Sequence, residues 1–335
     1  MNSGSFGWYD SFKESQPLTP MIVLQSDTLK AHILTRGATL AGFWLRGHPR
    51  SLVLGFEDPL AFDSAAFYAG AIVGPVANRV ARGQIELDNQ VFQMPSNEGT
   101  TCLHSGDDGL HAQDWTITDQ TASSVTLETA LPDAAIGLPG ARRIRATYAL
   151  EAGNTLVLTI TATSDCDTVM NLAHHPYWTL DEKADVSHHQ LQIHADIYLP
   201  VDDQNLPTGH ITPVAGSTYD FRTRRAVPVD RTLDANLCVA TARSDTPRDV
   251  ATLTGGTGLA LHIASTEPGL QVYNGSGLPS DGPSALPGQN IAPFAGIALE
   301  PQGWPDAPNH PQFPSILLPA GAEYRQETRY RISAD

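Results

Sequence analysis

Residues 156–162 of this 335-residue chain, Leu-Val-Leu-Thr-Ile-Thr-Ala, show the alternation that decides the fold class. Leu156, Leu158 and Ile160 occupy every second position. Successive side chains of a strand point to opposite faces, so this spacing predicts a half-buried strand. The same period of two recurs in three further segments, which are residues 191–199, 259–263 and 324–332.

Turn signals between these segments favour many short strands. The chain contains 28 glycines and 25 prolines, and Asp88-Asn89 between two apolar runs predicts a hairpin over residues 85–94. We find no long stretch with helical periodicity. The sequence therefore predicts an all-β fold, a large antiparallel β-sandwich. We expect residues 21–335 to form a single domain and residues 1–20 to form a loose N-terminal leader.

Composition excludes several classes of partner. The formal net charge is −16, which disfavours nucleic acids and anionic membranes because both require basic surfaces. The N-terminus lacks the basic and apolar regions of a signal peptide, and no apolar run approaches the ~20 residues that span a bilayer. A cytoplasmic location follows by default. The three widely spaced cysteines predict no disulfide framework.

Polar residues gather in five segments of the chain. They are residues 74–80, 97–106, 171–178, 233–236 and the pair 270–275 with 299–307. Taken singly, His104, Arg79 and Asp234 are more often structural than functional. Glu300 directly follows an apolar run, where a carboxylate needs a partner.

The adjacent histidines His174 and His175 cannot both enter one site. Strand alternation places His175 on the face of Tyr177, and His174 on the opposite face with Leu172. Such a pair is a poor metal ligand set, and the group around His188 is equally weak. We predict no metal site.

Taken together, these segments resemble the aldose 1-epimerase (galactose mutarotase) family over roughly residues 30 to 332. Residues 74–80 resemble its G-R-x-x-N-R-I segment, and Leu103-His104 resembles its L-H-G-G. Residues 171–180 resemble N-L-T-N-H-S-Y-F-N-L. Residues 299–309, Leu-Glu-Pro-Gln-Gly-Trp-Pro-Asp-Ala-Pro-Asn, resemble L-E-T-Q-x-x-P-D-A-x-N.

The resemblance implies a galactose mutarotase-like supersandwich with a sugar cleft and no cofactor. It implies that the enzyme interconverts the α and β anomers of a free aldose, a hexose or a pentose. His175 matches the general acid of the family, and Glu300 matches its general base. The positions that match sugar contacts are Asn78, Arg79, His104, Asp234 and Gln271, with Tyr177 as a further candidate.

Departures from the family pattern leave the preferred sugar unidentified. Pro75 stands where an arginine is usual, His174 replaces Asn, and Ala235 replaces His. Three alternative functions stay open: a non-catalytic sugar-binding sandwich, a hexose-phosphate epimerase, and a glycosidase using Asp234 and Glu300. The sequence identifies no protein partner and no oligomeric state.

Overall fold

The computed structural model describes residues 20–64 and 67–334, and its ladders are antiparallel β-sheet with one isolated parallel bridge. The predicted leader, apart from Pro20, lies outside the described residues. The helical elements are the four-residue helix α1 (Ala61–Ser64) and the 3₁₀ turns η1 (Ala81–Gly83), η2 (Leu110–Ala112), η3 (Ala135–Gly137), η4 (Val186–His188) and η5 (Ala307–Asn309). No helix of the described residues is long and apolar enough to cross a membrane.

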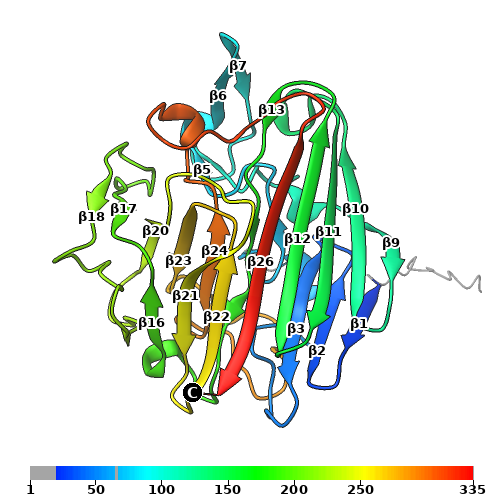
Figure 1. Ribbon diagram of the computed structural model, residues 1–335, viewed down its shortest axis with the longest axis vertical. Helices are drawn as coiled ribbons and strands as arrows, with labels where there is room; N and C mark the ends of the chain where they lie inside the picture. Colours follow the sequence, from blue (N-terminus) through cyan, green and yellow to red (C-terminus); the bar gives the residue numbers. More distant parts are fainter. Residues whose placement is uncertain (1–19, 65–66, 335) are drawn as a thin grey trace, which may run out of the picture.

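A nine-stranded sheet forms the front layer in Figure 1. Its strands, in spatial order, are β19 (Arg225–Ala226), β16 (Gln190–Ile193), β21 (Arg248–Thr254), β22 (Leu259–Ser265), β26 (Glu323–Ala334), β12 (Thr155–Ser164), β11 (Arg142–Glu151), β10 (Ser124–Leu131) and β9 (Thr116–Gln120). This layer contains three of the four segments predicted from alternation.

A six-stranded sheet and a three-stranded sheet lie behind this layer (Figure 1). The six-stranded sheet has the order β15 (Tyr177–Trp178), β24 (Ile297–Gln302), β23 (Gly269–Tyr273), β20 (Asp234–Cys238), β17 (Ile197–Leu199) and β18 (Thr212–Pro213). The three-stranded sheet has the order β1 (Met21–Gln25), β2 (Leu29–Leu34) and β3 (Thr39–Leu45).

Four short two-stranded ladders complete the fold. They are β13 (Thr168–Val169) with β25 (Leu317–Leu318), β14 (Ala173–His174) with β4 (Ile72–Val73), β5 (Arg79–Val80) with β8 (Cys102–Leu103), and β6 (Gln84–Leu87) with β7 (Gln90–Gln93). The last ladder confirms the predicted hairpin. Its turn residues Asp88 and Asn89 have φ values of 49° and 61°, which suit a type I′ turn.

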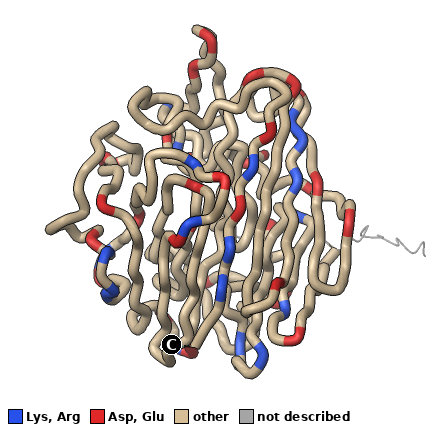
Figure 2. The backbone as a smooth tube through the Cα atoms, viewed as in Figure 1, with Lys and Arg blue, Asp and Glu red and all other residues tan. Residues whose placement is uncertain are grey.

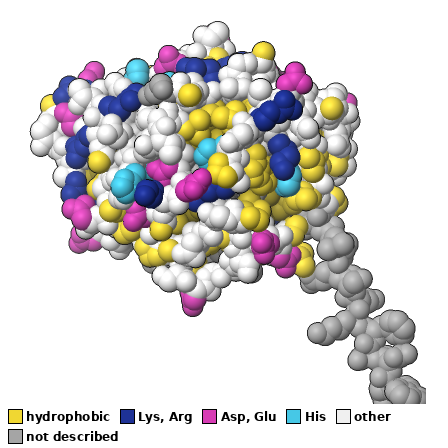
Figure 3. Space-filling view, turned by 90° about the horizontal axis from the view of Figure 1, so that it is seen from below, with side chains coloured by type: hydrophobic (Ala, Val, Ile, Leu, Met, Phe, Trp, Pro, Cys, Tyr) yellow, Lys and Arg dark blue, Asp and Glu magenta, His cyan; other side chains and the backbone are white. Residues whose placement is uncertain are grey.

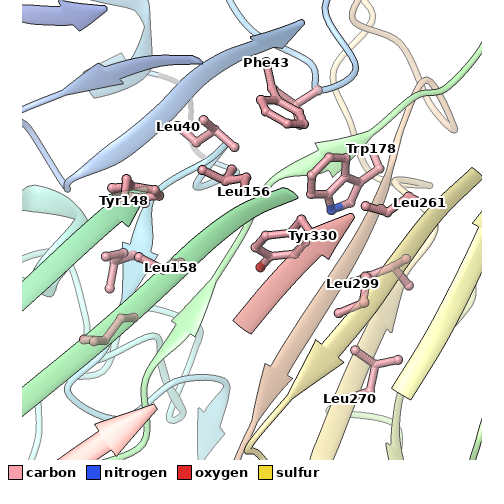
Figure 4. Packing of buried hydrophobic residues seen from close by; sticks show 14 of the residues in the cluster. Leu40, Phe43, Tyr148, Leu156, Leu158, Trp178, Leu261, Leu270, Leu299 and Tyr330 are labelled. Carbon is pink, nitrogen blue, oxygen red and sulfur yellow. The ribbon is translucent and has the colours of Figure 1, made fainter. Parts of the chain in front are cut away.

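The main hydrophobic core lies between the layers. Leu156 and Tyr330 from the front sheet meet Trp178, Leu270 and Leu299 from the six-stranded sheet (Figure 4). The rings of Trp178 and Tyr330 lie 5.1 Å apart between centroids. Burial of these alternate side chains holds the two layers together and confirms the predicted sandwich.

One segment departs from the prediction. Residues 191–199 alternate without interruption, but they form two strands, β16 and β17, which belong to different sheets. The intervening residues 194–196 carry the chain from one layer to the other. Period-two burial continues through the crossing because both strands contribute to buried clusters, so the sequence pattern does not reveal the break.

Charged side chains of both signs are interspersed over the molecule. Figure 2 shows acidic and basic residues along the same strands and loops, and the face in Figure 3 shows hydrophobic side chains gathered in patches between them. In the view of Figure 2 the acidic residues lie among the basic ones.

Because Leu156 packs between the layers, a cavity at this position should lower the free energy of unfolding strongly. Leu156 is fully buried on β12, so Leu156→Ala should lower the free energy of unfolding by about 2–5 kcal/mol. Urea denaturation measures the change. Val91→Ala on β7, where Val91 is 64% exposed, is the control and should stay within about 0.5 kcal/mol of the native protein. Equal midpoints for both variants would contradict this packing.

Candidate active site

Three neighbouring strands of the six-stranded sheet present a row of polar side chains. On β23 and β24, Leu270 and Leu299 face the core, so Gln271 and Glu300 face the opposite side. The register places Gln271 directly opposite Glu300. On β20, Asp234 lies diagonal to Gln271, and the Gln271 Nε2 donates a 2.5 Å hydrogen bond to Asp234 Oδ1.

The two adjacent histidines point in opposite directions, as alternation predicts. His174 lies in the core, where its Nδ1 is 3.1 Å from the hydroxyl of Tyr330. His175 faces the polar row with Tyr177, and the two rings lie 5.1 Å apart between centroids. The Nε2 of His175 lies 3.5 Å from Glu300 Oε1.

The short ladder of β5 and β8 brings Asn78 and His104 to the same place. Each has a positive φ, 64° for Asn78 and 50° for His104, at a bend beside a strand. The backbone N–H of Asn78 donates to His104 Nδ1 at 3.1 Å. The ring of His104 lies 5.5 Å from that of His175.

All eight residues singled out from the sequence line one cleft of about 460 Å³. They are Asn78, Arg79, His104, His175, Tyr177, Asp234, Gln271 and Glu300. The volume and the density of donors and acceptors suit a small polar ligand. Tyr177 contributes its ring, because its hydroxyl donates to the backbone carbonyl of Phe67 at 3.2 Å.

Two carboxylates hold Arg79 in the lining of this cleft. Its guanidinium donates to both oxygens of Glu98, at 2.6 Å and 2.9 Å. Its Nη1 lies 3.6 Å from Asp234 Oδ2. Burial raises the pKa of Asp234, and the charge of Arg79 opposes that rise.

Burial controls the protonation of the central pair. Glu300 is 2% exposed and His175 is 5% exposed. Burial raises the pKa of Glu300 well above its ordinary value, and the nearby Asp234 adds to this rise. Burial lowers the pKa of His175 to about 4. Desolvation by burial dominates both shifts, so the neutral forms of His175 and Glu300 are favoured.

The hydrogen bond to His104 decides what that ring can do. Because the Asn78 N–H donates to Nδ1, a neutral His104 carries its hydrogen on Nε2. Burial also lowers the pKa of His104 well below its ordinary value. His104 is therefore a hydrogen-bond donor to an oxygen in the cleft.

This tautomer opposes metal binding. His104, His175 and Glu300 can each bring one ligand atom to within 4.8 Å of the others, which is a donor set that zinc accepts. One nitrogen of His104 accepts from the backbone and the other carries the hydrogen, so no free lone pair remains for a metal. The geometry favours a hydroxyl-bearing ligand at this position.

The end of the motif at residues 299–309 has a structural task. Asp306 Oδ1 accepts from the backbone N–H of Ala81 at 3.0 Å and from Asn309 Nδ2 at 2.6 Å. Asn309 Nδ2 also donates to the carbonyl of Gln84 at 3.1 Å. These bonds tie the loop after Glu300 to the segment after Arg79, so one motif positions both residues.

The sequence interpretation missed several residues of the cleft. Those that line it are Phe67, Tyr68, Leu103, Asn205, Thr232, Tyr273, Ser276 and Gly277. Leu103 and Tyr273 lie inside segments already noted for their polarity, whereas the other six residues come from loops outside those segments, where no spacing indicates a shared site. Glu98, which holds Arg79, lies inside a segment already noted for its polarity, and that was the available signal.

Comparison with known proteins identifies the family. The model of the family described as Aldose 1-epimerase matches residues 20–331. The chain belongs to the aldose 1-epimerase family. It is 34% identical to galactose mutarotase from Sus scrofa over 92% of this chain and 93% of the relative. It is 30% identical to aldose 1-epimerase from Escherichia coli strain K12 over 96% of this chain and 97% of the relative.

Solved structures of the aldose 1-epimerase family share this fold. A GalM/aldose epimerase homologue from C. elegans has a TM-score of 0.87 and 30% identity, covering 94% of this chain and 99% of that chain. Galactose 1-epimerase from Lactobacillus acidophilus NCFM has a TM-score of 0.82 and 26% identity, covering 93% of this chain and 94% of that chain. The sandwich and the family membership predicted from sequence are both confirmed.

The bidentate contact with Glu98 predicts a role in holding Arg79. Glu98→Gln should raise KM up to about fivefold and leave kcat nearly unchanged, because a partly exposed ion pair contributes about 0.2–1 kcal/mol. Initial rates over a range of sugar concentrations measure both constants. The matched control is Glu128→Gln on β10, which breaks a similar contact with Arg145 and should change neither. A fall in kcat with unchanged KM would rule out this role for Glu98.

Proposed function

We propose that this protein interconverts the α and β anomers of a free aldose, with Glu300 as general base and His175 as general acid. The observation that carries the proposal is their separation of 3.5 Å in a cleft lined by hydroxyl-binding groups. Family membership supports the same reaction, because aldose 1-epimerases act at the anomeric carbon.

Ring opening requires two proton transfers. Glu300 removes the proton of the C1 hydroxyl while His175 gives a proton to the ring oxygen, and the bond between C1 and the ring oxygen breaks. The open-chain aldehyde then rotates about the C1–C2 bond. Ring closure on the other face of the carbonyl reverses both transfers, so the pair returns to its starting state.

The pair needs one proton in every step of this cycle. That proton lies on His175 before ring opening and on Glu300 after it. Burial favours the second arrangement in the unliganded cleft, because it leaves both groups neutral. Both arrangements contain the same number of protons, so binding of a sugar can redistribute the proton without exchange with solvent.

The remaining cleft residues suit the hydroxyls and the aldehyde of the sugar. Arg79 and the Nε2–H of His104 are donors, Asp234 is an acceptor, and the amides of Asn78 and Gln271 are both. Because contacts with Glu98 and Gln271 already hold Arg79 and Asp234, little side-chain freedom is lost when the sugar binds. These assignments extend the roles that the sequence resemblance implies.

A sugar phosphate fits the cleft less well. Among the described residues that line it, Arg79 is the one lysine or arginine, and it is paired with two carboxylates. A phosphate requires several uncompensated donors. Burying His175 against Glu300 costs desolvation free energy. A non-catalytic sugar-binding protein would gain nothing in return, so a catalytic role explains the buried pair better.

We further propose that residues 21–335 act as one domain and that catalysis uses neither metal nor cofactor. Cleft residues come from segments between residues 67 and 300, and the family match runs without interruption over residues 20–331, which supports a single domain. The tautomer of His104 supports metal-free chemistry. A cytoplasmic location stays a prediction of the sequence.

Removal of either proton-transfer group should abolish most activity. Glu300→Gln and His175→Asn should each lower kcat at least about 10²-fold, or roughly 3 kcal/mol. A plot of the wild-type kcat/KM against pH should be bell-shaped. It should fall at low pH, where the pair gains a second proton, and at high pH, where the pair loses its last one. The pH profile of each variant should keep only one of these two falling limbs. Polarimetry of fresh α-D-glucose or α-D-galactose from about pH 4 to about pH 9 measures the rates.

The proton-transfer assignment has a clear point of failure. If Glu300→Gln retained more than about a tenth of the wild-type kcat, Glu300 would not be the base. Sugar binding by calorimetry is the control, because both variants should still bind the aldose. Wild-type protein without mutarotase activity on any free aldose would refute the proposed function itself.

Asp234 should bind the sugar without transferring a proton. Its Oδ1 accepts from Gln271 and its Oδ2 faces Arg79, so Asp234→Asn removes charge but keeps the shape. We expect KM to rise more than kcat falls. Steady-state kinetics separate the two constants, and a large drop in kcat at constant KM would instead make Asp234 part of the acid–base machinery.

A further inference from the structure

The strand pairing that brings His175 and Glu300 together ends just before it reaches them. The ladder between β15 and β24 pairs Tyr177 with Ala298. Continued by two residues, this register brings His175 opposite Glu300, in agreement with the 3.5 Å between their side chains. The backbone N–H and C=O of His175 bond to residues 71 and 70 on its other side. Bonds across to β24 therefore fall to the neighbours of His175 in the chain.

Two prolines weaken the pairing at these neighbouring positions. Pro176 follows His175 and Pro301 follows Glu300, where the family motifs have Ser and Thr. On either side of an antiparallel pair of this kind, the flanking residues exchange backbone hydrogen bonds. Proline has no N–H, so two of the four flanking bonds cannot form. The backbone alone therefore joins residues 171–176 to residues 299–303 weakly, at the point where the two side chains must stay close.

Two core-facing side chains of β26 bridge these same segments. The backbone N–H of Leu172 donates to the hydroxyl of Tyr324 at 3.2 Å, and this hydroxyl donates to Gln326 Oε1 at 3.0 Å. The Nε2 of Gln326 then donates to the carbonyl of Pro301 at 2.9 Å. Each donor in the series meets an acceptor, so the direction of the bonds fixes the hydroxyl and the amide in one orientation.

The bridge is itself held firmly. Tyr324 is 4% exposed and Gln326 is 2% exposed, and β26 lies between β12 and β22 in the nine-stranded sheet. The guanidinium of Arg243 lies 3.9 Å from the centroid of the Tyr324 ring. The same guanidinium donates to the fully buried carboxylate of Glu267 at 2.9 Å. The ion pair keeps the ring in place, and the two neighbouring strands keep the backbone in place.

We propose that Tyr324 and Gln326 are positioning residues that set the distance between the two proton-transfer groups. Their bonds compensate for the backbone bonds that the two prolines cannot make. Neither side chain is among the described residues that line the cleft, so both act through the backbone of the segments they bridge. Asn171, whose Oδ1 accepts from the N–H of Gly303 at 2.7 Å, joins the same segments further from the pair. This inference rests on the proposed function, because it takes His175 and Glu300 as the acid and the base.

Three variants of β26 test this role. Tyr324→Phe removes the hydroxyl but keeps the ring against Arg243, and Gln326→Met removes the amide but keeps a side chain of similar length. Thr328→Val is the matched control. Thr328 is buried on the same face of β26, and its hydroxyl lies 3.1 Å from the Oγ of Ser265 on β22, within the front sheet. Polarimetry of fresh α-D-glucose and α-D-galactose gives kcat and KM, and thermal unfolding shows whether each variant is folded at the assay temperature.

We expect Tyr324→Phe and Gln326→Met each to lower kcat at least about tenfold, because a small displacement of reacting groups has a large effect on rate. KM should stay within about twofold of the wild-type value, because the sugar-binding residues Arg79 and Asp234 keep their own partners. The double variant should lose at most about twice as much activity as the weaker single variant, since the hydroxyl and the amide belong to one series of bonds. Thr328→Val should keep both constants within about twofold.

Three outcomes would overturn the role of these side chains. The first is a kcat within about twofold of wild type in both Tyr324→Phe and Gln326→Met. The second is a rise in KM as large as the fall in kcat. The third is an equal loss of activity in Thr328→Val, or failure of the first two variants to fold, because the bonds would then serve the stability of the sheet.

The wild-type protein separates this inference from the proposed function. Wild-type protein without activity on any free aldose contradicts the function, whatever the variants do. Active wild-type protein with unaffected variants contradicts only the positioning role of Tyr324 and Gln326.

Discussion

The active cleft depends on the alternation of side chains across three paired strands, β20, β23 and β24. Leu270 and Leu299 must face the core, because their burial between the layers holds the six-stranded sheet against the nine-stranded sheet. That requirement turns Gln271 and Glu300 to the other face. A shift in register of one residue would exchange the two sets and lose both the core and the site. Stability and function are thus constrained by the same pairing.

Burial then sets the chemistry of the groups that this pairing exposes to the cleft. A buried carboxylate and a buried imidazole both prefer to be neutral, and Glu300 and His175 satisfy this preference with one shared proton. The positive charge of Arg79 beside this pair is balanced by the carboxylates of Glu98 and Asp234. In the proposed mechanism this pair moves one proton inside a frame of groups fixed by hydrogen bonds. This arrangement suits a reaction in which the pair holds the same number of protons at the start and at the end.

Much of this arrangement could be predicted because it follows from local rules. Alternation indicates which face of a strand is buried, so the opposite orientations of His174 and His175 were accessible from sequence. The crossing between β16 and β17 was not, because the burial period continues through it. The role of Glu98 was also missed, since it comes from a contact with Arg79 on another segment of the chain.

By itself, the sequence determined the all-β class, the family and the identity of the acid and base candidates, because these depend on residue type, spacing and order along the chain. Tertiary structure alone decided that eight residues from five segments meet in one cleft, that burial favours the neutral forms of His175 and Glu300, and that Asn78 sets the tautomer of His104. The physical reason is that desolvation, hydrogen-bond direction and cavity walls depend on which residues are neighbours in space. The spacing of residues along the chain does not show these neighbours.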